Sequence, residues 1–118
     1  MTLSLDLEQE PNYWHLSLAG DLDYGECSAF RMSIDRILKS EPRAAVVDLS
    51  GLEYLDSSGL GLLLSMSKEY VIVGGRLVLV TNQTVDNILS LTRLNGIFAT
   101  ATTMEEAVQV LGSESLTD

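Results

Sequence analysis

Hydrophobic and polar side chains alternate along the first twenty residues of the chain. Apolar residues occupy every second position in residues 3–7, and the large apolar residues of the segment 13–19 follow the same period. A period of two is typical of a strand with one buried face. The dipeptide Pro11-Asn12 between the two segments indicates a turn. The pattern therefore predicts a β-hairpin whose second strand ends at Gly20.

Four later segments are predicted to be helices. In residues 24–39, apolar side chains recur at three- and four-residue spacing, which is typical of an amphipathic helix. Asp23 is a candidate N-cap for this helix, and Glu26 stands where a capping box requires it. The other predicted helices are residues 57–71, 84–94 and 103–111, the last with Thr103 as its N-cap.

Short and nearly continuous apolar runs predict the remaining strands. Residues 44–49 and 77–80 are apolar at almost every position, as in strands that are buried on both faces. Ser50-Gly51 is predicted to form a turn after the first run, and residues 97–98 a short last strand. Because strands alternate with helices, we predict an α/β fold with a mixed sheet of four or five strands and about four helices. A length of 118 residues suits a single domain over residues 1–118, with 112–118 as a flexible tail.

The composition argues against several classes of function. Seven basic residues face seventeen acidic ones, a net charge of −10, so no basic patch is available to bind nucleic acid. The longest apolar run is far shorter than the roughly 20 residues of a membrane span, and the first residues do not resemble a signal peptide. We therefore expect a cytoplasmic protein without a membrane span. With one cysteine, Cys27, and one histidine, His15, we expect no metal site and no cofactor. Cys27 falls on the core side of its predicted helix.

The segment most informative about function is residues 46–64, where a predicted strand leads through a loop to a helix that starts at a serine pair. Ligands and modifications favour the carboxyl ends of strands in α/β sheets, and N–H groups at a helix N-terminus solvate anions. A phosphate on Ser57 would add a charge of about −1.5 to −2 beside Asp56 and repel a partner. The alternative is ordinary capping, with Asp56 as N-cap and Ser57 and Ser58 in the first turn.

The helix at residues 57–71 also has features of a contact surface. Gly59 and Gly61 lack side chains, so another backbone can approach closely. Leu62 and Met66 fall off the predicted core face, and we expect a protein contact there unless another element covers them. At about 100° per residue, that core face consists of Leu60, Leu63, Leu64, Ser67, Tyr70 and Val71.

In this order and spacing, several short motifs resemble the anti-sigma factor antagonists of the bacterial STAS domain family. The resemblance extends from about Leu3 to Leu111, and the motif after the central strand matches most closely. The motifs are Gly20-Asp21-Leu22-Asp23, Val46-Val47-Asp48-Leu49-Ser50, Leu55-Asp56-Ser57-Ser58-Gly59-Leu60-Gly61, Gly74-Gly75, Ile88-Leu89-Ser90-Leu91-Thr92, Ile97-Phe98 and Glu105-Glu106-Ala107. One departure is Arg93, which stands where many relatives have glycine.

The resemblance implies a single STAS-type domain that acts as a switch. The unphosphorylated protein is expected to bind an anti-sigma factor that is also a serine kinase, which releases a sigma factor. Phosphorylation of Ser57 by this kinase is expected to end the binding, and a metal-dependent serine phosphatase to restore it. The residues implied to surround the site or contact the partner are Asp21, Asp23, Asp56, Ser58, Gly59, Leu60, Gly61, Leu62 and Met66.

Two other functions stay open. One is a STAS module that binds constitutively within a transport or signalling assembly, without phosphorylation. The other is a small hydrolase with Ser57 as its nucleophile, although the Gly-x-Ser-x-Gly motif of such enzymes is missing around this serine. The strand alternation also points His15 away from Trp14 and Leu16, which favours an isolated surface histidine. We therefore expect a binding protein rather than an enzyme.

Overall fold

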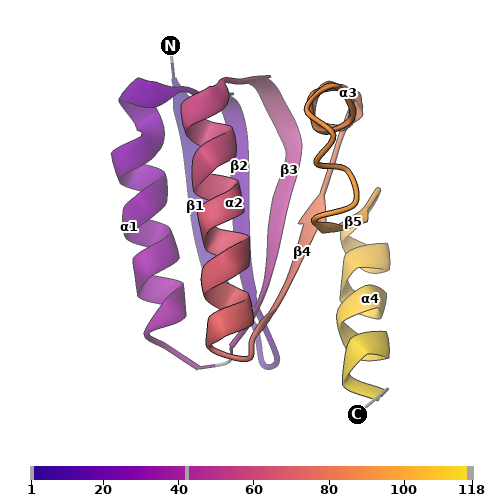
Figure 1. Cartoon of the computed structure of the whole chain (residues 1–118). Coiled ribbons are helices and arrows are strands. Elements are labelled where there is room, and N and C mark those ends of the chain that lie inside the picture. The colour runs from indigo at the N-terminus through magenta and orange to yellow at the C-terminus, as the bar shows by residue number, and fades with distance from the viewer. Residues whose placement is uncertain (1, 42, 117–118) are drawn as a thin grey trace.

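The computed structural model describes residues 2–41 and 43–116, with side chains through Gly112. Its five strands form one sheet in the order β1-β2-β3-β4-β5. Strand β1 is antiparallel to β2 and every other pair is parallel, so the sheet is mixed, as predicted. The elements are β1 (Leu3–Gln9), β2 (Trp14–Leu22), the 3-10 helix η1 (Tyr24–Glu26), α1 (Cys27–Leu38), β3 (Ala44–Leu55), α2 (Ser57–Ile72), β4 (Arg76–Val80), α3 (Gln83–Leu91), β5 (Ala99–Ala101) and α4 (Met104–Leu116) (Figure 1).

The helices form a layer on each side of the sheet. Helices α1 and α2 lie side by side over β1–β3 (Figure 1), and Val85 and Leu89 of α3 join the same core cluster. Helix α4 packs on the opposite face, where Ala107 and Leu111 meet side chains of β3–β5. Among the described residues, no helix has both the length and the apolar character that are required to cross a bilayer.

The alternating burial of β3 explains its continuous apolar sequence. Ala45, Val47 and Leu49 belong to the cluster under α1, α2 and α3, whereas Ala44 and Val46 belong to the cluster under α4. A strand covered on both faces needs apolar side chains at successive positions. The prediction of a buried central strand is therefore confirmed.

Strands β2 and β3 are longer than predicted. The expected end at Gly20 and the expected turn at Ser50-Gly51 are both wrong, because the two strands stay paired up to Leu22 and Leu55. The pairing shifts register twice on the way, and Gly20 has a positive φ of 94°. Gly20 and Ser50-Gly51, which suggested strand ends in the sequence, therefore lie within strands whose pairing is irregular.

Other element boundaries also differ from the predictions. Asp23 makes no side-chain capping bond, so the predicted capping box is wrong, and η1 precedes α1 instead. The last strand is Ala99–Ala101 rather than residues 97–98. Helix α4 continues through Leu116, past the predicted end at residue 111. Its cap is as predicted, since the Thr103 hydroxyl accepts the N–H of Glu106 at 3.1 Å.

Helices α2 and α3 end in the same hydrogen-bonded motif. After α2, the Gly74 and Gly75 N–H groups donate to the carbonyls of Val71 and Tyr70; after α3, residues 93 and 94 repeat this arrangement. Both motifs place one residue in the left-handed region, and glycine is the usual choice there. Gly74 serves α2 with φ 74°, whereas α3 uses Arg93 with φ 61°, the only non-glycine with positive φ among the described residues.

Candidate functional site

The candidate site lies where β2 and β3 end and α2 begins. Leu22 and Leu55 are the last residues of their strands and are paired in the ladder. The Asp56 N–H donates to the Leu22 carbonyl at 3.3 Å. Ser57 follows as the first residue of α2. The carboxyl ends of two parallel strands therefore set the position of the helix N-terminus.

Asp56 links the two segments that border this edge of the sheet. Its Oδ1 atom accepts the N–H of Gly59 at 3.0 Å, which caps α2. Its Oδ2 atom accepts the N–H of Tyr24 at 3.0 Å, which holds the start of η1. The capping role predicted for Asp56 is confirmed. The same carboxylate also accepts an N–H group at the start of η1. From the sequence, Asp23 was expected to cap the helix in this region.

The serine pair differs in exposure. Ser57 is exposed and Ser58 is half-buried, so the Ser57 hydroxyl is open to an approaching protein. In the first turn of α2, the Gly59 and Leu60 N–H groups are used by the Asp56 side chain and carbonyl. Ser57 thus lies at the positive end of the helix dipole, directly after a fixed carboxylate.

A shallow, open depression of about 450 Å³ adjoins the site. Three carboxylates contribute to its lining, so the depression is acidic. Two aromatic side chains also border it, with Tyr24 81% and Tyr54 45% exposed. Its lining residues are Asp23, Tyr24, Gly25, Glu26, Tyr54 and Asp56. Asp23 and Asp56 were predicted from the sequence to lie at the site, whereas the two tyrosines were not. The exposure of Tyr54 depends on the extension of β3 past Gly51, which the sequence did not indicate.

The glycines after Ser57 have different surroundings. A Cβ atom on Gly59 would lie 2.7 Å from Leu22 Cγ, 2.8 Å from the Leu22 carbonyl oxygen and 2.8 Å from Leu55 Cδ1. Gly59 therefore permits a close approach, as predicted, but the approaching backbone is the chain's own β2. A Cβ atom on Gly61 would meet nothing within 4 Å. Among these glycines, Gly61 leaves space for another molecule.

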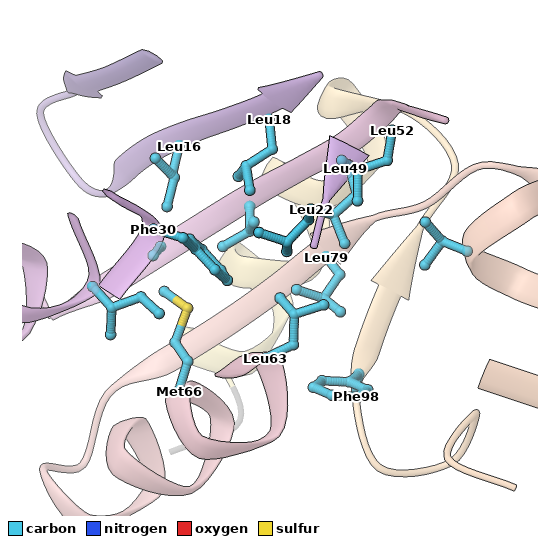
Figure 2. Close-up of a cluster of buried hydrophobic side chains, with 14 of the residues drawn as sticks. Leu16, Leu18, Leu22, Phe30, Leu49, Leu52, Leu63, Met66, Leu79 and Phe98 are labelled. Carbon is cyan, nitrogen blue, oxygen red and sulfur yellow. The ribbon is translucent and has the colours of Figure 1, made fainter. Parts of the chain in front are cut away.

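The core face of α2 is rotated from the predicted one. Met66 is fully buried and Leu60 is 8% exposed, whereas Val71, which was assigned to the core, is 76% exposed. The Met66 side chain points from α2 into the cluster, toward Phe30 of α1 (Figure 2). Leu62 is half-buried and packs against the same cluster. The expectation of a surface contact at Met66 is wrong because α1 covers that side of α2.

Two other candidate residues lie close to the site. Asp21 is half-buried in β2 and is paired with Tyr54, but it does not line the depression. Cys27 is half-buried rather than in the core, and its thiol donates to the Asp23 carbonyl at 3.3 Å. Burial, followed by the negative charges of Asp56 and Asp23, raises the pKa of the Cys27 thiol. The thiol therefore stays neutral near the carboxylates.

The structure separates His15 from Ser57. His15 pairs with Val46 in the ladder, and at about 3.3 Å per residue the strand from Val46 to Leu55 spans roughly 30 Å. The His15 Nε2 atom instead lies 3.0 Å from the Ser17 hydroxyl and 4.0 Å from Asp48 Oδ2. Ser57 and His15 therefore do not form a nucleophile–base pair. No group of three or more potential metal-binding side chains occurs within the described ranges.

Replacing Asp56 tests its double capping role. We expect Asp56→Ala to lower the free energy of unfolding by about 1–2 kcal/mol, because two N–H groups lose a charged acceptor. Asp56→Asn retains one acceptor oxygen and should cost less than the alanine. Urea unfolding of the three proteins measures both effects. Equal stability of Asp56→Ala and the unmodified chain would show that the carboxylate does not hold the two segments together.

The sequence matches a known family over most of its length. The family model of the STAS domain matches residues 4–107. The anti-sigma F factor antagonist of Paenibacillus polymyxa is 32% identical over 69 residues, which cover 58% of this chain and 59% of that protein. The anti-sigma-F factor antagonist RsfB of Mycobacterium tuberculosis is 35% identical over 54 residues, which cover 46% of this chain and 44% of RsfB. The chain thus matches about half the length of these relatives.

The fold is shared with a solved anti-sigma factor antagonist. SpoIIAA in its unphosphorylated form has a TM-score of 0.77 and 26% sequence identity, and the match covers 93% of this chain and 97% of that chain. The Bacillus cell fate determinant SpoIIAA in the phosphorylated form has a TM-score of 0.71, also at 26% identity, with 90% and 97% covered. Because the family model and the fold both extend over most of the chain, this protein belongs to the STAS domain family.

Proposed function

We propose that this chain is an anti-sigma factor antagonist that is switched by phosphorylation of Ser57. Its unphosphorylated form binds an anti-sigma factor that is also a serine kinase, and this binding releases a sigma factor in the cytoplasm. The observation that carries the proposal is the position of Ser57, which is exposed as the first residue of α2 and directly follows Asp56, a residue that lines the acidic depression. The anti-sigma factor antagonists with which the chain shares sequence and fold support the same role.

The fold can accept a phosphate on Ser57. An anion at a helix N-terminus is stabilised by about 0.3–1 kcal/mol, and the exposed hydroxyl does not have to leave the core to be modified. The existence of SpoIIAA structures in both phosphorylation states supports this point for a relative of the same fold. Phosphorylation is therefore expected to change binding without unfolding the domain.

The added charge explains why phosphorylation ends binding. A kinase that reaches the Ser57 hydroxyl must cover the surrounding surface, including the depression with Asp23, Glu26 and Asp56. The switch requires the partner groups that face the Ser57 hydroxyl to be apolar or acidic, because a basic group there would attract a phosphate. The phosphate adds about −1.5 to −2 charges at the centre of the contact, and it also fills the space that the hydroxyl had left to the partner. Both effects favour dissociation, after which a serine phosphatase resets the switch.

The first test is phosphorylation by the cognate kinase. We expect intact-mass measurement after incubation with the kinase and ATP to show one added phosphoryl group, and peptide mapping to place it on Ser57. Ser57→Ala should stay unmodified and Ser58→Ala should still be modified. A stable complex with no mass change would favour a constitutive binding subunit, and modification at another residue would contradict the proposed switch.

The second test separates charge from the loss of the hydroxyl. Without ATP, Ser57→Ala should bind the kinase as tightly as the unmodified chain, and Ser57→Asp should bind at least about tenfold more weakly. Ser4→Asp is a matched control, since Ser4 is exposed on β1 and its neighbours Leu3 and Leu5 face the α1–α2 layer. Equal affinity of Ser57→Asp and Ser57→Ala for the kinase would rule out a charge-based switch.

A further inference from the structure

The end of α3 and the segment that follows it expose two large apolar side chains and a cation. Leu91 is 84% and Ile97 is 57% exposed, although both are large apolar residues within seven positions of each other. Arg93 lies between them in sequence and is exposed as well. We call Leu91, Arg93 and Ile97 the α3-end patch. The three residues are close in sequence, and exposed apolar side chains near an arginine are typical of protein contact sites.

Arg93 is a poor choice for the fold at this position. Its φ of 61° is in the left-handed region, which disfavours every residue with a Cβ atom. The equivalent position after α2 is Gly74, and the hydrogen bonds of the two helix ends are the same. Glycine would therefore serve the backbone better than arginine. The side chain of Arg93 must be explained by something other than the end of α3.

The guanidinium of Arg93 also binds no other group among the described residues. Arg31 and Arg43 form ion pairs, Arg36 lies over the Trp14 ring, and Arg76 has an interaction of its own. Among the described arginines, Arg93 is the one whose side chain has no hydrogen bond, ion pair or ring contact. In a chain of net charge −10, this isolated cation is a local exception. It is suited to an acidic group on another protein.

We propose that the α3-end patch is a second contact surface for the anti-sigma factor, which rests on the function proposed above. The partner surface it fits is apolar at its centre, to cover Leu91 and Ile97, and carries a carboxylate that pairs with Arg93. Helix α3 and the loop after it lie on the same face of the sheet as α2 (Figure 1). In this proposal, the partner that covers the Ser57 end of α2 extends over this face to the α3-end patch. Strain at Arg93 is retained because it supplies a cation for this contact.

The proposal predicts opposite effects of Arg93→Gly on stability and on binding. Glycine relieves the left-handed strain, so the melting temperature should rise by roughly 3 °C. The loss of one exposed ion pair should weaken kinase binding about fivefold. Leu91→Ser removes an apolar contact and should weaken binding at least about tenfold, with little effect on the melting temperature because Leu91 is already exposed. A residue that served only the fold would not give a higher melting temperature together with weaker kinase binding when it is replaced by glycine.

The experiment is calorimetric titration of the cognate anti-sigma factor kinase, without ATP, into the full chain and its variants. Val71→Ser is the matched control for Leu91→Ser, since Val71 is 76% exposed at the far end of α2, and it should bind normally. If Ser57→Asp weakens binding while Arg93→Gly and Leu91→Ser do not, the α3-end patch is not a partner surface and the proposed function stands. If the unmodified chain does not bind the kinase, both proposals fail. If light scattering shows that Leu91→Ser dissociates a dimer while kinase affinity is unchanged, the patch joins two copies and the inference is wrong.

Discussion

Met66→Ala is expected to lower the free energy of unfolding by about 3 kcal/mol, within the range for truncation of a buried methionine. Met66 has no exposed surface, and its side chain extends from α2 toward Phe30 of α1 (Figure 2). Truncation leaves a cavity between the two helices. Because the surrounding side chains are closely packed, they cannot move enough to fill this cavity. Urea unfolding measures the loss as a lower midpoint with an unchanged slope.

Val71→Ala is the matched control for this experiment. The helical period alone assigns Val71 to the core face and Met66 to the surface, whereas the structure assigns them the other way round. An exposed valine in a helix should be replaceable by alanine with a change within about 0.5 kcal/mol. If Val71→Ala lowered the free energy of unfolding as much as Met66→Ala or more, the face of α2 that the structure places in the core would be wrong.

Gly59→Ala is the second change with a large expected effect, a destabilisation of about 3 kcal/mol, at the upper end for overpacking. The new methyl group would collide with Leu22 and Leu55, and one of the colliding atoms is a backbone oxygen at 2.8 Å. Backbone at the end of β2 cannot move aside as a flexible side chain can, so α2 must shift. Because Ser57 lies two residues earlier, the kinase affinity should fall as well.

Gly61→Ala separates this collision from the general cost of changing a glycine. Gly61 lies in the same helix, but its added methyl group meets nothing within 4 Å. Alanine is favoured over glycine in a helix by about 1 kcal/mol, so Gly61→Ala should raise the melting temperature. If Gly59→Ala were also neutral or stabilising, the close approach of α2 to β2 would not be needed for the fold.

The contacts that support the candidate site involve the residues on either side of Ser57 but not Ser57 itself. Asp56 holds both η1 and α2 through its two carboxylate oxygens. Gly59 lets the first turn of α2 rest on the last residues of β2 and β3. Ser57 lies between these two residues and takes part in neither contact. A modification of Ser57 can therefore change the surface and leave the supporting interactions in place.

The sequence by itself determined those features that depend on neighbouring residues. The period of two in β1 and β2, the apolar run of β3 and the order of strands and helices all predicted a mixed α/β sheet, which the structure confirms. Asp56 and Thr103 were recognised as helix caps, because a capping bond spans only three residues. The order and spacing of the short motifs along the chain indicated the STAS domain family, which the family model confirms.

Only the tertiary structure decided which surfaces are covered and which residues meet across the chain. Met66 is buried because α1 packs beside α2, and no local period contains that information. Strand β3 passes through Ser50-Gly51 because β2 remains available as a pairing partner. The contact from Asp56 to Tyr24 joins residues 32 positions apart, and the same arrangement leaves Tyr24 and Tyr54 exposed beside Ser57. Local sequence specifies backbone preferences, whereas burial and long-range hydrogen bonds depend on how complete elements pack against one another.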